Sequence, residues 1–139
     1  MHYVVLVKTL VNREADQSYD DLRQQAILLA GDELDYVRGQ MIDYYDDSPQ
    51  ILKTFLTRKD GEKVQACRAT EFEKFTEFVP EALMFDRYID HYFMEKYGVD
   101  WDKVLEREIK EAVDEELGPY HAEYESNMQT WFVTMDVHI

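Results

Sequence analysis

The chain contains a single cysteine, Cys67, among its 139 residues, so no disulfide can form within it. A protein without disulfides is typical of a reducing compartment, and we expect this one in the cytoplasm. Its first residues carry no basic segment followed by a long apolar run, which predicts no signal peptide. No apolar stretch approaches the ~20 residues that cross a bilayer, so the sequence predicts a soluble protein.

Glycine and proline are scarce, with five and three residues, and they are scattered along the chain. Because no glycines cluster before a helix, the chain lacks the loop with which common nucleotide-binding proteins hold phosphates. No Gly/Ser-rich linker divides the sequence, and its length is ordinary for one domain. We therefore expect residues 1–139 to form a single acidic domain with no cofactor.

Basic residues are also few, since fifteen Lys and Arg stand against thirty Asp and Glu, a net charge of -15. Nucleic-acid binding needs cations that displace counterions from phosphates, so direct DNA or RNA binding is disfavoured. An anionic membrane surface would repel the chain for the same reason. A basic protein partner, or a cation, fits this charge better.

The N-terminal part of the chain predicts a strand followed by a helix. Residues 3–11 are β-branched and almost continuously apolar, which is typical of a central strand buried on both faces. Ser18 and Asp21 have the spacing of a helix N-cap and an acid in the first turn. Apolar residues then recur at helical spacing over Leu22–Ala30, and Gly31 is a natural end of that helix.

Residues 32–47 fit two structures. Their apolar residues favour a second helix that ends before Pro49, and we predict this helix. Gly39 weakens a helix, however, and residues 36–45 are also compatible with an extended segment.

The middle of the chain predicts a hairpin and then helices. Residues 50–59 and 62–69 are β-compatible and are separated by Asp60-Gly61, a dipeptide that favours a tight hairpin turn. Further helices are expected after a capping box at Thr70 and Glu73, from Pro80 to Gly98, and over residues 100–117.

The C-terminal residues 130–139 alternate between apolar and other side chains, which predicts a strand at the sheet edge or beside the first strand. The predicted fold is therefore α+β, with about four strands (the N-terminal strand, the central hairpin and the C-terminal strand) and helices on one side. Its βαββαβ order resembles a ferredoxin-like fold with an enlarged second helical segment. That fold supports many activities and indicates no function.

The acidic residues concentrate in residues 81–125, which hold fourteen Asp and Glu against five Lys and Arg. In a helix over residues 100–117, carboxylates three and four residues apart would lie ~5–6 Å apart at their Cβ atoms. Such rows approach the spacing of phosphates on a nucleic-acid strand. The plainer interpretation is a solvated face, because three cations share the helix. The candidate partner-binding residues here are Glu106, Glu108, Glu111, Asp114, Glu115 and Glu116.

A second acidic segment has the sequence Asp43-Tyr44-Tyr45-Asp46-Asp47. Tyrosine is favoured at interface hot spots, so Asp43, Asp46 and Asp47 are further candidate partner-binding residues. The alternative is a helix end whose two rings pack against the core.

Catalytic and metal-binding constellations are weak. His91 and Glu95 lie one helical turn apart, but no other segment supplies a matching set of ligands, and we predict no metal site. His121 and Glu123 match half of a zinc-deaminase signature whose cysteine pair is absent. Cys67 lies in an expected strand and is interpreted as a small core residue rather than a nucleophile.

These observations favour a non-enzymatic acidic protein that docks on a basic protein and inhibits or regulates it. The partner would be a nucleic-acid-handling protein or a toxin, and one form of the hypothesis is a nucleic-acid mimic. One alternative is an assembly protein that forms a homo-oligomer through the C-terminal strand and Trp131. Another is a metal-dependent enzyme that uses His91 and neighbouring carboxylates.

Overall fold

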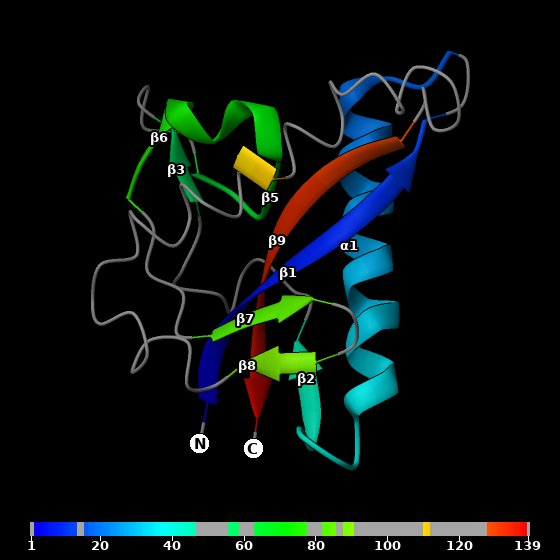
Figure 1. The fold of residues 1–139 in the computed structure, drawn as a ribbon, viewed down its shortest axis with the longest axis vertical. Helices are drawn as coiled ribbons and strands as arrows, with labels where there is room; N and C mark the ends of the chain where they lie inside the picture. The colour runs from blue at the N-terminus through cyan, green and yellow to red at the C-terminus, as the bar shows by residue number, and fades with distance from the viewer. Residues whose placement is uncertain are drawn as a thin grey trace.

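Two long antiparallel strands form the centre of the computed structural model (Figure 1). β1 covers His2–Asn12 and β9 covers Met128–His138, and the two pair along their whole length. The structure describes residues 2–13, 16–46, 56–58, 63–77, 82–85, 88–90, 110–111 and 128–138. The pairing confirms the strands that the sequence predicts at both ends of the chain.

Shorter strands extend this pair into a mixed sheet with the order β2-β9-β1-β7-β8. β2 is Tyr44–Asp46, β7 is Ala82–Phe85 and β8 is Tyr88–Asp90. β5, Ala66–Arg68, pairs with β9 beside this path. β7 runs parallel to β1, and the other pairs are antiparallel.

A second, three-stranded antiparallel sheet lies beside the first. Its order is β4-β3-β6, with β3 at Leu56–Arg58, β4 at Lys63–Val64 and β6 at Phe75–Glu77. A 3₁₀ helix, η1, spans Ala69–Lys74 and connects β5 to β6.

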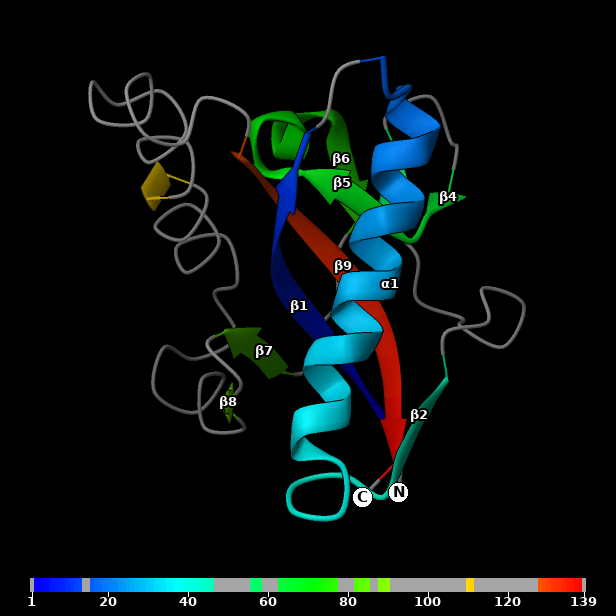
Figure 2. The same cartoon turned by 90° about the vertical axis from the view of Figure 1, so that its right-hand side faces the viewer.

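Helix α1, Tyr19–Val37, packs along one face of β1 and β9 (Figure 2). Two buried alanines, Ala26 and Ala30, face the sheet and let the helix approach closely, and Leu34 continues the same face. Full burial of one such leucine contributes about 2 kcal/mol to stability. The buried sheet residues of this core include Val5, Val7, Val11, Trp131, Val133, Met135 and Val137.

The opposite face of the central strands is buried in its middle part. Leu6, Phe132 and Cys67 have no exposed surface. The buried hydroxyl of Thr134 donates to the backbone carbonyl of Gln65 at 3.2 Å, which satisfies a polar group inside the core. Burial on both faces is confirmed around Val5–Val7, whereas Leu10 near the end of β1 is 54% exposed, and Cys67 is a core residue as expected.

Gly31 does not end the first helix, contrary to prediction. The Tyr45 hydroxyl lies 3.3 Å from the position of a Cβ atom at Gly31, so glycine there gives room for a side chain packed against the helix. Leu34 and Val37 continue the buried face for two more turns. The left-handed backbone suited to a helix end occurs at Gly39, with φ of +83°.

The predicted second helix over residues 32–47 is also wrong. Residues up to Val37 belong to α1, and after a turn the chain becomes strand β2. The extended alternative is correct for Tyr44–Asp46, because these residues pair with the edge of β9. Pairing with a neighbouring strand overrides the helical spacing of the side chains.

The hairpin is confirmed by the antiparallel pairing of β3 with β4. Its expected turn, Asp60-Gly61, lies outside the described residues. The second hairpin strand divides at Gln65, whose carbonyl accepts from the Thr134 amide at 2.9 Å. Beyond Gln65 the chain continues in the main sheet as β5.

The helices predicted between Phe75 and Asp90 are wrong, because the described residues of this segment form strands. Thr70 and Glu73, predicted as a capping box, lie within the 3₁₀ helix η1, after which β6 pairs with β3. The apolar run at Ala82–Phe85 pairs with β1, whose backbone would otherwise present an open edge. Of the predicted helix 100–117, the described residues Lys110 and Glu111 are helical.

The C-terminal strand lies inside the sheet, with partners on both of its edges. Trp131 in this strand is fully buried, so neither its ring nor the strand edge offers the contact expected of an assembly protein. The α+β class is confirmed, whereas the ferredoxin-like order with its enlarged second helical segment stays a prediction, because residues 91–109 and 112–127 lie outside the described residues. No helix in the described part of the chain is long and apolar enough to span a membrane.

Candidate functional site

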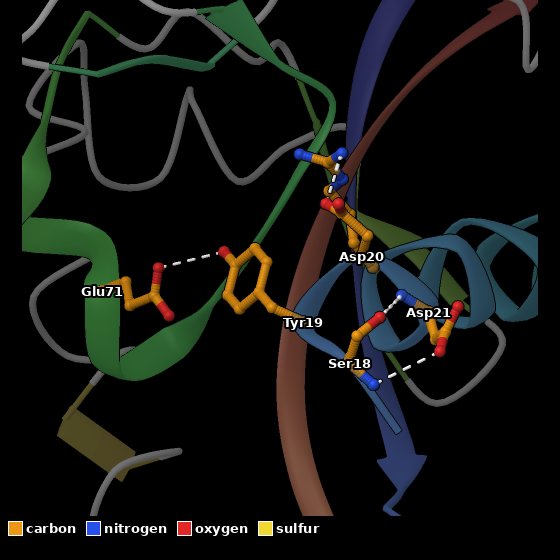
Figure 3. Close-up of polar contacts among 6 residues, drawn as sticks. Ser18, Tyr19, Asp20, Asp21 and Glu71 are labelled. Carbon is orange, nitrogen blue, oxygen red and sulfur yellow. Dashed lines mark hydrogen bonds and ion pairs between the residues drawn. The ribbon is translucent and has the colours of Figure 1, made fainter. Parts of the chain in front are cut away.

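The N-terminus of α1 is fixed by a complete capping box (Figure 3). The Asp21 amide donates to the Ser18 hydroxyl at 3.1 Å, and the Ser18 amide donates to the Asp21 carboxylate at 3.2 Å. Arg23 forms an ion pair with Asp20 at 2.9 Å. The first turn is therefore ordered, and the only cation within α1 already has a carboxylate partner.

Tyr19 connects the start of α1 to two other elements. Its hydroxyl donates to the Glu71 carboxylate in η1 at 3.0 Å (Figure 3). Its ring centroid lies 5.2 Å from that of Trp131, a distance at which tilted aromatic rings attract one another. These contacts hold α1 in one orientation against the rest of the fold.

The side of α1 that faces away from the sheet combines exposed apolar and acidic residues. Leu28 is 69% exposed and Tyr36 is 54% exposed, although both are large hydrophobic side chains. At ~100° per residue, three exposed aspartates lie within ~40° of Leu28 around the helix axis. We define the α1 outer face as Asp21, Gln24, Leu28, Asp32, Asp35 and Tyr36, all exposed.

The charge of α1 is strongly negative. The helix holds Asp20, Asp21, Asp32, Glu33 and Asp35 against Arg23 alone, a net charge of -4. Asp35 lies in the last turn, which contains no basic residue. A carboxylate there is unfavourable by about 0.3–1 kcal/mol, because the helix macrodipole is negative at its C-terminus. The acids at this end are therefore not explained by the stability of the helix.

Asp43 and Tyr44 form a second exposed group, at the end of the sheet. The Asp43 carboxylate lies 3.4 Å from Nδ1 of His138, and its amide donates to the His138 carbonyl at 2.7 Å. The Tyr44 ring stacks on the His138 ring at 4.6 Å with 7° between the planes. Tyr44 is exposed while Tyr45 packs against the core, as the alternation of a strand requires.

The remaining predicted site residues are only partly placed. Asp46 lies in β2 opposite Asp136 of β9, and Glu111 is helical and exposed. Nothing in the described residues brings Glu111 together with Asp43 or Asp46. The other predicted site residues, Asp47, Glu106, Glu108, Asp114, Glu115 and Glu116, lie outside the described residues, as do His91, Glu95, His121 and Glu123.

Within the described residues, no three His, Cys, Asp or Glu side chains are placed to hold a metal ion. Cys67 is fully buried, which is consistent with its interpretation as a core residue.

Sequence reasoning missed the α1 outer face, although a signal for it exists. Leu28 lies outside the helical stripe formed by Leu22, Ala26 and Ala30, so it faces away from the core. Its neighbours on that side are acidic. A leucine on the wrong side of an amphipathic helix, among carboxylates, is the pattern that identifies this face.

Comparison with models of protein families, with curated proteins and with solved structures finds no match for this chain. A functional assignment therefore depends on the chain's own residues and their geometry.

Proposed function

We propose that this protein is a non-enzymatic acidic binding protein that docks on a basic protein and inhibits or regulates it. The observation that carries the proposal is the α1 outer face, where Leu28 and Tyr36 are exposed among carboxylates on a rigid helix. Nucleic-acid-handling proteins and basic toxins are the expected partner classes, because both carry dense positive charge.

The charge distribution supports docking in two ways. A net charge of -15 attracts a basic protein over long distances and raises the association rate. At short range, exposed apolar side chains inside a charged rim resemble the hot spots of protein interfaces. A leucine side chain contributes nothing to the binding of a small cation, so the surface fits a protein better than an ion.

The nucleic-acid mimic is a narrower form of this proposal. It depends on the predicted helix 100–117, with its candidate residues Glu106, Glu108, Glu111, Asp114, Glu115 and Glu116. The acidic segment at Asp43–Asp47 would then extend the negative surface.

Affinity capture from the native host tests the proposal. The full chain is immobilised beside two charge variants, Asp32→Asn/Glu33→Gln/Asp35→Asn on α1 and Glu108→Gln/Glu111→Gln/Glu115→Gln on the predicted helix. We expect a basic protein that binds at low salt, elutes at high salt and is lost from the α1 variant. If no basic protein is captured, or if both variants capture it as well as the unmodified chain does, the proposal is wrong.

A further inference from the structure

We infer that the α1 outer face binds a basic amphipathic helix of the partner protein, with Leu28 and Tyr36 as its apolar anchors. This inference rests on the proposed function and names the structural class of the segment that docks.

The spacing of the anchors fits a helical partner. Leu28 and Tyr36 are eight residues apart, which places them ~12 Å apart along the helix axis and ~80° apart around it. A second helix that crosses α1 at an inclined angle presents apolar side chains every three or four residues, so it can reach both anchors. Its flanking Lys and Arg side chains would meet Asp21, Asp32 and Asp35.

The same face is poorly suited to imitate a nucleic acid. Asp21 and Asp32 are eleven residues apart, ~16 Å along the axis, with neutral Gln24 and Leu28 between them. A groove built for closely spaced phosphates would meet an exposed leucine at its centre and leave cationic groups without partners. An apolar stripe with basic flanks matches both features of the face.

A second copy of the chain is a poor occupant. Two α1 outer faces in contact would bring helices of net charge -4 together, and like charges across an interface are unfavourable. A basic helix gains from the same carboxylates. Charge complementarity therefore selects a positively charged partner over self-association.

The face is ready to bind without rearrangement. The opposite side of α1 is buried against β1 and β9, and the capping box fixes the first turn. Because the helix is already ordered, binding loses little conformational entropy on this side of the interface.

The test measures binding of the full chain to two synthetic 18-residue peptides of equal leucine and lysine content. In one peptide the leucines recur at helical spacing on one face, and in the other the same residues are scrambled. We expect the amphipathic peptide to bind at least tenfold more tightly in calorimetry at physiological salt. Tyr36→Ser should weaken binding of the amphipathic peptide several-fold. Asp32→Asn/Asp35→Asn should weaken this binding too, and should make it less dependent on salt concentration.

The matched pair of variants is Leu28→Gln and Leu10→Gln. Leu10 is 54% exposed on β1, so its replacement removes a comparable apolar surface away from the α1 outer face. Leu28→Gln should weaken binding of the amphipathic peptide about tenfold, and Leu10→Gln should leave it unchanged. Circular dichroism checks that both variants keep the fold.

Three outcomes overturn the inference. If both peptides bind equally and the charge variants bind neither, docking on a basic protein is supported but a helical partner is excluded. Equal effects of Leu28→Gln and Leu10→Gln remove the apolar anchor. A dimer in light scattering that Leu28→Gln abolishes makes a second copy the occupant. The proposed function itself fails separately, when host capture yields no basic protein.

Discussion

The two sides of α1 obey different rules, although they share one backbone. The inner side is apolar and small where it meets the sheet, and its residues are fixed by packing against β1 and β9. The outer side is largely exposed, and burial in the core does not explain why Leu28 and Tyr36 are there. Exposed apolar side chains, and a carboxylate at the C-terminal end of the helix, are unfavourable for stability. On the exposed side of α1 these are the features that indicate binding.

The largest effect is expected on the inner side. Leu34→Ala should reduce the free energy of unfolding by about 3 kcal/mol, because it removes buried atoms and leaves a cavity between α1 and the sheet. Urea unfolding followed by circular dichroism measures the change. A loss below about 1 kcal/mol would show that the inner side is not as tightly packed as the structure indicates.

The capping box should contribute next. Ser18→Ala removes the acceptor for the Asp21 amide and should cost about 1 kcal/mol. The same unfolding experiment applies, with Ser18→Asp as the control, since an aspartate at the N-cap position restores the acceptor. Equal losses in both variants would mean that the hydrogen bond is not the cause.

On the outer side the sign should reverse. Asp35→Asn should raise the free energy of unfolding by about 0.3–1 kcal/mol, because it removes a negative charge from the negative end of the helix dipole. The gain should shrink in high salt, where exposed charges are screened. If Asp35→Asn destabilises the protein, the carboxylate stabilises the fold, and the proposed difference between the buried and the exposed side of α1 does not hold at this residue.

The smallest effect on stability is expected at Leu28. Leu28→Gln should change the free energy of unfolding by less than about 0.5 kcal/mol, since the side chain is largely exposed to solvent. A loss above about 1 kcal/mol would show that Leu28 supports the fold, and the contrast between the two sides of α1 would disappear.

Local patterns in the sequence predict the elements whose signals agree with their surroundings. The apolar N-terminal strand, the alternating C-terminal strand and the Ser18–Asp21 cap are all found where the pattern places them. The N-terminal strand is a β-branched apolar run, the C-terminal strand alternates, and the helix has a cap, and each of these patterns favours the structure that is found. The α+β class follows from these elements alone.

The failures share a physical cause. The apolar run at Ala82–Phe85 is compatible with helix or strand, and its pairing with the edge of β1 decides between them. Gly31 is a typical helix end, yet Tyr45 from β2 uses the space that it leaves. A local window of sequence does not show such tertiary contacts. It also does not show which of the acidic segments carries exposed apolar residues.

The central claim is that docking occurs on the outer face of α1. The most direct test is NMR titration of the full, isotope-labelled chain with the amphipathic leucine–lysine peptide. We predict that the largest amide shifts fall within residues 19–37, centred near Leu28, and that Leu28→Gln removes them. Shifts confined to residues 106–116 or 43–47, with α1 unaffected, would contradict the claim and return the site to the acidic segments that the sequence alone favours.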